Sequence, residues 1–412
     1  MMDMITRFKL AARNAARNRR RSVATLASVV IGFVALSLFE GYFVSVYSSL
    51  EDEVIVGERL GHLTIAKPGL FDKGAQDPRR YAFTESELAK ATAKLKAIPG
   101  VKLVSPRIAM SGLVSNGDTS RIYIGEGMRA EDMLVLRGEK YADQPGKLDP
   151  QKPQGAVFGK RLAESLGLKP GGDATLLGAT LDGMVNAVGI QVLEASATGS
   201  LGTDDKFVLT SLDTARRLMA YDGAERIVLL LEQGTDLAAT TDAVTAALAG
   251  EGIQVEVRDW RTLSVYYNQV KNLFDMMYLF ISIVVAIVVL ASVFNTMGMT
   301  ITERTREIGT LRALGMQVRT LDGLFVLEGM LIVAIGCAAG MAVTLALGAL
   351  INGAGITYMP PDAAAEVPLV VKLVAGNLVG SLFTLVVLAA VASYLPARRA
   401  SRRNIVGALS HV

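Results

Sequence analysis

The sequence predicts a membrane protein with four transmembrane α-helices and one large α+β domain between the first and the second of them. Three observations support this fold class: four long apolar runs, one long region of mixed pattern, and basic residues gathered beside the runs. The 412 residues are 51% hydrophobic, with a mean hydropathy of +0.38, which is too apolar for an ordinary soluble protein and too polar for spans alone. The predicted segments, in order, are a cytoplasmic interfacial elbow helix (1–21), a first span (22–47), an outside domain with stalk helices (48–275), a second span (276–300), a cytoplasmic coupling helix (301–323), a third span (324–351), an outer loop (352–368), a fourth span (369–395) and a cytoplasmic tail (396–412).

The charged residues predict on which side of the membrane each segment lies. The three cytoplasmic segments hold 15 Lys and Arg against 4 Asp and Glu, whereas the rest of the chain holds 27 against 35. Basic residues in short loops stay in the cytoplasm, so both termini are expected there and the large domain is expected outside. Because the basic residues of these segments adjoin spans, nucleic acid is excluded as a partner.

The first 47 residues predict an amphipathic helix followed by a span. Residues 1–21 mix apolar and basic positions, which suits a helix lying under the membrane. A cleaved signal peptide is the alternative, but the apolar stretch is too long and ends without a small-residue cleavage site. Ala24, Ser28 and Gly32 recur every fourth residue and predict a face for close helix packing. Glu40 is expected either to face a cavity or neighbouring helix, or to be wetted at the outer interface.

The outside domain alternates strand-like runs with helical patterns, as expected of an α+β domain of mixed order. Turn chemistry separates the elements, for example Ile98-Pro-Gly-Val after a helix and Ser115-Asn-Gly-Asp in a hairpin. Helices are expected at 85–97, 158–168, 211–221 and 236–249. Strands are expected at 62–66, 101–105, 108–114, 120–125, 173–178, 188–195, 206–209, 225–232 and 253–258.

Residues 301–323 turn abruptly charged between two apolar runs and predict a short amphipathic helix at the cytoplasmic surface. Ile308, Leu311, Leu314 and Val318 recur at spacings of three and four, so they form one apolar stripe. A helix resting in lipid headgroups would show this pattern. The sharper interpretation is a knob that docks into a groove on a soluble partner.

The third and fourth spans each contain a pair of glycines at GxxxG spacing. Gly336 and Gly340 lie in the third span, and Gly376 and Gly380 lie in the fourth. Such faces let helix backbones approach closely, although chance is the alternative in spans rich in Gly and Ala. Pro396 is expected to end the fourth span, because proline interrupts helical hydrogen bonding.

Ten residues of the charged segment, Arg306-Glu-Ile-Gly-Thr-Leu-Arg-Ala-Leu-Gly315, resemble the coupling segment of FtsX-like ABC permeases. This type VII superfamily includes MacB-like macrolide-export permeases and LolCE-like lipoprotein-releasing permeases, and the resemblance extends over the whole chain. It implies a bacterial inner-membrane protein whose periplasmic domain has a ferredoxin-like lobe (about 60–100 and 206–258) carrying a β-rich insertion (about 101–205). It assigns contact with a cytoplasmic ATPase to Glu303, Arg304, Arg306, Glu307, Ile308, Gly309, Leu311, Arg312, Ala313, Leu314 and Gly315.

The sequence carries no motif for nucleotide or metal chemistry of its own. No GxxxxGK(S/T) is present, and Gly155-Ala-Val-Phe-Gly-Lys-Arg161 is a near miss with the wrong spacing. One cysteine, Cys337, and two histidines, His62 and His411, exclude an intrachain disulfide and a multi-histidine zinc site. We therefore expect a non-catalytic permease that binds no cofactor directly and depends on ATP and Mg²⁺ held by a separate ATPase, unlike the fused macrolide-export members.

Four spans, or eight in a pair of subunits, make a slender bundle. We therefore expect the chain to transmit motion to the periplasmic domain rather than to enclose a polar path. In the family, such motion extracts lipoproteins, expels periplasmic cargo or activates cell-wall hydrolases. Segments such as Gly61-His-Leu-Thr-Ile and Phe158-Gly-Lys-Arg-Leu-Ala look most like the lipoprotein-releasing branch. A lateral cavity for acyl chains is expected to be lined by Phe33, Phe39, Glu40, Phe43, Phe274 and Met277.

The implied partners are a dimer of cytoplasmic ABC ATPase subunits, a second permease that is identical or homologous, membrane lipid, and a periplasmic lipoprotein carrier or adaptor. Two other functions stay open. One is MacB-like export of periplasmic cargo. The other is a membrane sensor or scaffold, or a regulator of a hydrolase, that works without transport. A bound ABC ATPase would argue against the sensor.

Overall fold

The computed structural model describes residues 19–74, 76–138, 144–198, 201–359 and 366–402. The chain divides into a helical unit (Met1–Ser48, Val270–Thr357 and Pro368–Val412) and an α+β unit (Ser49–Gln269 and Tyr358–Val367). The predicted elbow helix, apart from residues 19–21, and residues 403–412 of the predicted tail lie outside the described residues.

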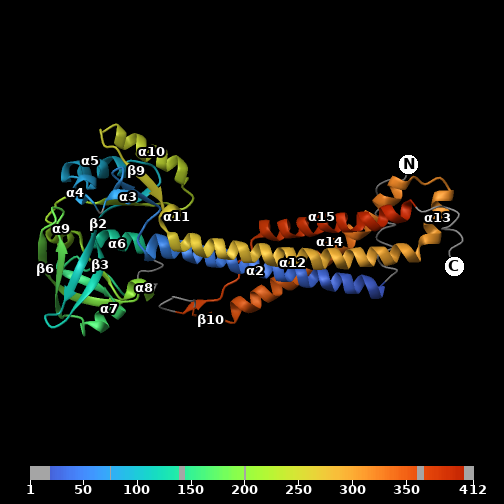
Figure 1. Cartoon of the computed structure of the whole chain (residues 1–412), viewed down its shortest axis with the longest axis horizontal. Helices are drawn as coiled ribbons and strands as arrows, with labels where there is room; N and C mark the ends of the chain where they lie inside the picture. The colour runs from blue at the N-terminus through green and yellow to red at the C-terminus, as the bar shows by residue number, and fades with distance from the viewer. Residues whose placement is uncertain (1–18, 75, 139–143, 199–200, 360–365, 403–412) are drawn as a thin grey trace. The chain divides into compact units, whose positions relative to one another are not determined.

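The helical unit contains four helices that are long and apolar enough to cross a membrane, counted over the described residues. They are α2 (Arg19–Asp52), α12 (Val265–Glu303), α14 (Val318–Gly353) and α15 (Ala375–Ser401) (Figure 1). A short helix, α13 (Thr305–Ala313), separates α12 from α14, and the strands β10 (Thr357–Tyr358) and β11 (Val367–Pro368) lie between α14 and α15 in sequence. The predicted fold class, four apolar helices with a large α+β domain between the first and the second, is confirmed.

All four helices contribute to one apolar core. Its buried members include Phe33 of α2, Val289 of α12, Cys337 of α14 and Leu385 of α15. Other faces of the same helices carry exposed apolar side chains such as Phe280, as expected where lipid is the solvent. Because lipid tails are as apolar as these side chains, close packing rather than the hydrophobic effect must hold the helices together.

Helix α15 continues through Pro396 to Ser401, although the sequence placed the end of the fourth span at this proline. Proline removes one backbone hydrogen bond and disfavours a helix interior. Pro396 is buried, and so are Ala392, Ala397 and Ala400 on either side of it. Packing of this face against the chain outweighs the lost hydrogen bond, so the helix does not end there.

The described part of the α+β unit forms a nine-stranded sheet in the order β3-β7-β4-β6-β5-β2-β8-β1-β9. The strands are β1 (Leu63–Ala66), β2 (Val101–Ser115), β3 (Ser120–Met128), β4 (Gly155–Gly159), β5 (Asp173–Ala179), β6 (Val185–Ser196), β7 (Phe207–Ser211), β8 (Arg226–Leu231) and β9 (Glu256–Asp259). The helices are the π-helix η1 (Glu53–Gly57), α3 (Leu70–Lys73), α4 (Pro78–Tyr81), α5 (Glu85–Lys96), α6 (Ala130–Arg137), α7 (Lys160–Ser165), α8 (Leu201–Asp204), α9 (Leu212–Met219), α10 (Leu237–Ala249) and α11 (Trp260–Leu263).

One end of the sheet, here called the first lobe, has the ferredoxin-like strand order β9-β1-β8-β2. Every pairing in it is antiparallel, and β8 pairs with the first half of β2. A capping box between Thr84 and Glu87 starts α5. Helices α5 and α10 cover one face of the strands (Figure 1). Leu95 of α5 and Val244 of α10 pack into the same buried cluster as Ile227 of β8.

The rest of the sheet, with α6 to α9, is here called the insertion lobe. Its core contains Tyr123, Phe158, Leu176 and Leu218. The sequence assigned the region of β7 and α9 to the ferredoxin-like lobe. That assignment is wrong, because β7 pairs with β3 and β4 of the insertion lobe, and α9 packs into its core.

Strand β2 is shared by the two lobes. The sequence predicted two strands, 101–105 and 108–114, and Pro106, which has no N–H to donate, lies in the gap between them. The strand is in fact continuous, and Arg107 is its last residue paired with β8, while Ile108 is its first residue paired with β3. The proline therefore lies where the ladder changes partner, which is where a missing donor disturbs it least.

Candidate functional site

The charged segment between α12 and α14 contains the predicted coupling residues. Helix α13 occupies Thr305–Ala313, and Arg304 separates it from α12. After α13, Gly315 has a φ of +90°, which glycine adopts without strain and which commonly ends a helix. The end of α13 therefore explains, by local backbone conformation, why a glycine closes the predicted motif.

The part of the apolar stripe that lies on α13, Ile308 and Leu311, packs against its own chain. Ile308 is 4% exposed and belongs to a buried cluster with Leu321 of α14 and Ala397 of α15. Leu311 packs against the same cluster, whereas Leu314 is 80% exposed. Part of the stripe is thus covered by the chain itself, and docking of this segment into a partner stays a prediction, because periodicity reveals a stripe but not what covers it.

The outer surface of this segment is mainly polar. Gly309 is buried beside Ile308, and Arg312 is half-buried. Exposed predicted coupling residues, which are accessible to a partner, are Glu303, Arg306, Glu307, Ala313, Leu314 and Gly315. We call these six residues the exposed coupling face.

Arg304 ties the start of α13 to α14. Its Nη1 lies 3.5 Å from Oε2 of Glu328, which is 2% exposed, and its Nε lies 3.9 Å from Oε2 of Glu307. The Arg304 side chain is itself 11% exposed. This predicted coupling residue therefore forms a largely buried ion pair within the chain.

Aromatic side chains gather where α2 meets α12. The ring centroids of Phe43 and Phe274 are 4.9 Å apart, and Phe39 lies 6.1 Å from Phe43. Further rings in contact with these are Tyr42, Tyr47 and Tyr278. Phe33 lies apart from them in the bundle core, whereas Met277 is 42% exposed. The structure thus brings together three of the predicted cavity residues, Phe39, Phe43 and Phe274.

Polar contacts accompany these rings. The carboxylate of Glu40 accepts a hydrogen bond from the hydroxyl of Ser381 in α15, at 3.3 Å. The hydroxyl of Tyr47 in α2 donates to Asp275 in α12, at 2.7 Å. Glu40 therefore faces a neighbouring helix, which is one of the two surroundings expected for it.

Some of the predicted packing glycines lie at helix contacts and others do not. A Cβ on Gly32 would meet Val285 of α12 at 2.8 Å, and Cβ atoms on Gly336 and Gly340 would meet Val29 and Phe33 of α2 at 2.8 and 3.0 Å. Ser28 instead donates its hydroxyl to the carbonyl of Ala24 in its own helix. No described atom lies within 4 Å of a Cβ built on Gly376 or Gly380.

Helices α14 and α15 approach closely at a glycine that the sequence analysis did not single out. A Cβ on Gly329 would lie 1.9 Å from Oγ of Ser393, whose hydroxyl donates to the carbonyl of Ala389. A small residue is obligatory at this point. Gly329 has no GxxxG partner in the sequence, so its spacing gave no signal.

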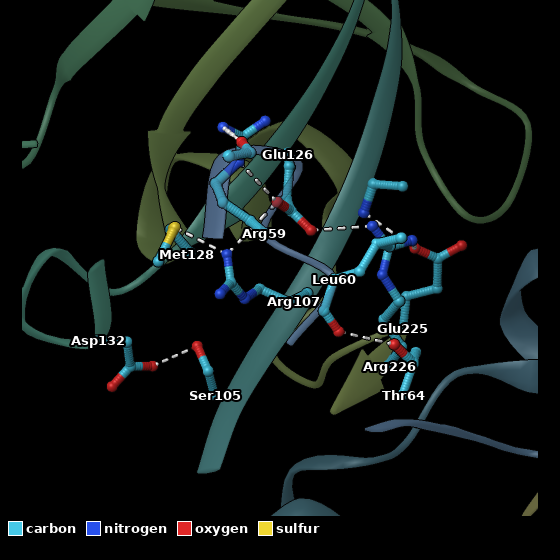
Figure 2. A network of polar contacts seen from close by, with 12 residues as sticks. Arg59, Leu60, Thr64, Ser105, Arg107, Glu126, Met128, Asp132, Glu225 and Arg226 are labelled. Carbon is cyan, nitrogen blue, oxygen red and sulfur yellow. Dashed lines mark hydrogen bonds and ion pairs between the residues drawn. The ribbon is translucent and has the colours of Figure 1, made fainter. Parts of the chain in front are cut away.

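A cluster of charges, of which Arg107 and Glu126 are buried and Arg59 and Arg226 partly buried, lies where the two lobes meet. We call Arg59, Arg107, Glu126 and Arg226 the charged cluster. Figure 2 shows the side chains converging on the Glu126 carboxylate from β2, β8 and the segment before β1. Oε1 of Glu126 lies 2.8 Å from Arg226, and Oε2 lies 3.3 Å from Arg107 and 3.5 Å from Arg59. Nearby, the hydroxyl of Ser105 donates to Asp132 at 2.6 Å.

Three guanidiniums face one carboxylate in this cluster, and Glu225 gives Arg226 a second acidic partner at 3.3 Å. Burial by itself would raise the pKa of Glu126, but the guanidiniums of Arg107, Arg226 and Arg59 outweigh it and hold the pKa below its ordinary value. Burial lowers the pKa of Arg107 to about 10, so its guanidinium remains charged at neutral pH. A buried charge is tolerated only when it is paired, so these residues hold one another in place.

A cavity of about 370 Å³ lies beside the charged cluster. Asp52, Glu53 and Arg59 line one side, and Met133, Val157 and Phe207 of the insertion lobe line another. Arg137 also lines it and donates to the carbonyls of Gln144, Pro145 and Gly146. Among the residues with described positions, no group of three or more His, Cys, Asp or Glu side chains is arranged to hold a metal ion.

Sequence reasoning missed the charged cluster entirely. Its members are far apart in the chain, and isolated Arg and Glu residues in strands read as solvent-facing positions. The available signal was Arg107 and Glu126 within otherwise apolar or small-residue runs. Nothing in the spacing indicated that they would meet.

Two protein families match this chain. The profile of the FtsX-like permease C-terminal family matches residues 279–405. The profile of the MacB-like periplasmic core domain matches residues 22–247, which is more than half of the chain.

Individual relatives are similar at low identity. The macrolide export ATP-binding/permease protein MacB of Acinetobacter baylyi is 22% identical over 100% of this chain and 60% of its own length. The lipoprotein-releasing system transmembrane protein LolC of Neisseria meningitidis serogroup B is 25% identical over 79% of this chain and 77% of its own. The chain spans 39% and 58% of two further curated relatives. The solved periplasmic region of MacB from Actinobacillus actinomycetemcomitans aligns with 49% of this chain and 90% of its own, at 14% identity and a TM-score of 0.33.

Proposed function

This chain belongs to the family of ABC transporter permeases that join an FtsX-like C-terminal region to a MacB-like periplasmic core domain, and on that premise we propose that it converts ATP hydrolysis by a separate cytoplasmic ATPase into motion of its periplasmic domain. The chain is a multi-pass membrane protein. We infer from the distribution of basic residues that both termini and α13 are cytoplasmic, in a bacterial inner membrane.

The observation that carries the proposal is the way α13 is anchored. Its buried side packs through Ile308 against α14 and α15, and Arg304 adds an ion pair to Glu328 of α14. A force applied to the exposed coupling face would therefore move α14 and α15 rather than deform a loose loop. Such anchoring suits a segment that a partner pushes.

We propose that the partner is a dimer of ABC ATPase subunits and that a second permease, identical or homologous, completes the transporter. The 412 residues contain no phosphate-binding GxxxxGK(S/T) motif, so ATP and Mg²⁺ would be held by the partner. Several curated relatives are named as ATP-binding/permease proteins, which supports an ATPase in the same assembly.

We propose an amphiphilic cargo of lipoprotein or lipid type. Phe39 and Met277 expose 43% and 42% of their surface, and the half-buried carboxylate of Glu40 is next to Phe39 in α2. Apolar rings beside one polar group suit a molecule with an acyl chain and a polar head. The similarity to a lipoprotein-releasing protein over 79% of this chain supports the same class of cargo.

Export of periplasmic cargo is the second candidate. It is favoured by relatives named for the export of macrolides and of pyoverdine. The two candidates differ in where the cargo starts, which is the membrane in the first and the aqueous periplasm in the second.

The first test is purification of the full chain from its own membranes in mild detergent, with mass spectrometry of everything retained. A stoichiometric soluble ABC ATPase is the expected result, and co-purified lipoprotein or lipid would identify the cargo class. A chain that stays paired with a second permease but retains no ATPase would overturn the proposal in favour of a sensor or scaffold.

The second test addresses the exposed coupling face. Leu314→Ala and Glu307→Ala are expected to lower transport per ATP hydrolysed without changing the stability of the chain, because both side chains are exposed. Ile308→Ala is the matched control, since it removes a buried side chain and should lower stability instead. Full transport by both exposed-face variants would contradict the assignment.

A further inference from the structure

The segment that leads from α2 into the sheet is short and conformationally constrained; we call Glu53–His62 the joint. Helix α2 ends at Asp52, one turn of π-helix follows, and β1 begins at Leu63. Arg59 has a φ of +62°, a region that side-chain-bearing residues other than Asn and Asp seldom occupy. Strained positions of this kind persist only where surrounding contacts hold them.

The first half of the joint is anchored to the first lobe by apolar packing. Val54 and Ile55 are 1% and 6% exposed. They belong to a buried cluster with Leu103 of β2, Leu230 of β8 and Trp260 of α11. One residue of the insertion lobe, Leu136 of α6, completes this cluster.

The second half of the joint is anchored to the insertion lobe by one side chain. The guanidinium of Arg59 lies 3.5 Å from Glu126 of β3 and stacks 4.4 Å above the ring of Phe207 in β7. Its Nη1 also donates to the carbonyl of Gly57 at 2.7 Å, which fixes the turn (Figure 2). The cavity described above lies between Glu53, Val56 and Gly57 of the joint and residues of the insertion lobe.

We propose that Arg59 is a positioning residue that makes the insertion lobe follow the end of α2. This inference rests on the proposed function, because it concerns how motion of α2 reaches the periplasmic domain. The charged cluster also holds Arg107 and Arg226, the residues at which β2 changes partner from β8 to β3. A displacement of the joint therefore acts on Glu126 at the boundary between the lobes.

The test uses the full chain with Cys337→Ser, spin-labelled at Ser49→Cys near the end of α2 and at Met184→Cys in the insertion lobe, both of which are exposed. Without ATPase or nucleotide, the distance distribution between the labels is expected to be narrow. Arg59→Asn should broaden it, because Asn tolerates the left-handed backbone but cannot reach Glu126 and Phe207. Arg129→Asn is the matched control, since Arg129 pairs with Asp132 at 3.3 Å outside the joint, and it should leave the distribution narrow.

The same variants are then assayed with the ATPase partner. Arg59→Asn is expected to lower transport per ATP by about tenfold, a typical coupling between protein sites, while assembly and ATP hydrolysis continue. Arg59→Lys should recover part of the loss, because it keeps the charge but not the stacking plane.

An unchanged distance distribution in Arg59→Asn would overturn the inference, as would a broadened distribution with full transport per ATP. The two proposals can fail separately. If the distance distributions change as expected but the complex with unsubstituted Arg59 couples no transport to ATP hydrolysis, the proposed function is wrong, whereas the role of Arg59 in positioning the insertion lobe is retained.

Discussion

The α+β unit and the helical unit each bury a carboxylate beside arginine, but they connect different lengths of chain. Glu126 joins residues 59, 107 and 226, which belong to the joint and to both lobes. Glu328 pairs with Arg304, which is only one helix away in sequence. A long-range cluster fixes the arrangement of a whole domain, whereas a short-range pair fixes one turn. The cost of losing each carboxylate should differ accordingly.

The largest effect is expected from Glu126→Gln. It leaves the fully buried guanidinium of Arg107 without its carboxylate and removes a partner from Arg59 and Arg226, which should lower the free energy of unfolding of the α+β unit by about 3–5 kcal/mol. The single tryptophan, Trp260, is buried in this unit, so its fluorescence during denaturant unfolding reports the change. Glu225→Gln is the control, because Glu225 is 31% exposed and should cost no more than about 1 kcal/mol. If Glu225→Gln destabilised the unit as much as Glu126→Gln, the buried position of Glu126 in the charged cluster would have no special effect on stability.

A smaller and more local effect is expected from Glu328→Gln. Loss of this charge-assisted contact should cost about 1.5–3 kcal/mol and expose α13 to proteolysis at Arg306 and Arg312. Trp260 fluorescence should be unchanged, since the contact lies in the helical unit. If Glu328→Gln also destabilised the α+β unit, the Arg304–Glu328 ion pair would affect more than the surroundings of α13.

Close packing in the helical unit is tested by one substitution at two places. Gly329→Ala should cost about 1–3 kcal/mol, because the new methyl group would lie 1.9 Å from Ser393 Oγ. Gly380→Ala meets no described atom within 4 Å and should change stability by less than about 0.5 kcal/mol. Thermal unfolding in detergent compares the two. A Gly380→Ala variant as unstable as Gly329→Ala would indicate a contact made by a second chain.

The smallest expected effect is a pH dependence of the α+β unit. The Nδ1 of His62 accepts the backbone N–H of Leu231 at 3.1 Å, and burial lowers the pKa of His62. The unfolded chain therefore binds a proton more readily than the folded chain. Stability should be complete above pH 6.5, the ordinary pKa of histidine, should fall as the pH drops from 6.5 to the lowered pKa, and should stay constant below it. His62→Gln should abolish this pH dependence of stability, measured by Trp260 fluorescence during unfolding. If the pH dependence persists in His62→Gln, it belongs to another titratable group.

Composition and hydropathy were sufficient to predict the four spans, because about 20 apolar residues in a row have few other structures available. The ferredoxin-like lobe came from the resemblance, but its predicted segments included β7 and left out the first half of β2, which pairs with β8. Strand β4 was missed, since its five residues begin and end with glycine and read as a turn, although all five are buried. Short runs of this kind have no periodicity to detect.

The candidate sites were less predictable than the fold. The stripe on α13 was recognised, but what covers it depends on Ala397 of α15, which is far from it in sequence. Arg304 was assigned to a partner because nothing in the sequence pairs it with Glu328. Likewise, the charged cluster depends on which residues of β2, β3 and β8 lie opposite one another, and pairing register is not readable from one strand at a time.

The shared strand has a consequence for how the chain acquires its structure. β1 is made first, yet its partners are β8 and β9, at the far end of the domain sequence, and β2 cannot complete its ladder until both lobes have been made. During export, the early strands must wait with unpaired edges while the insertion lobe emerges, a state in which chains are open to misfolding. The insertion lobe is therefore not a removable module: excising it would cut a strand that the first lobe also needs.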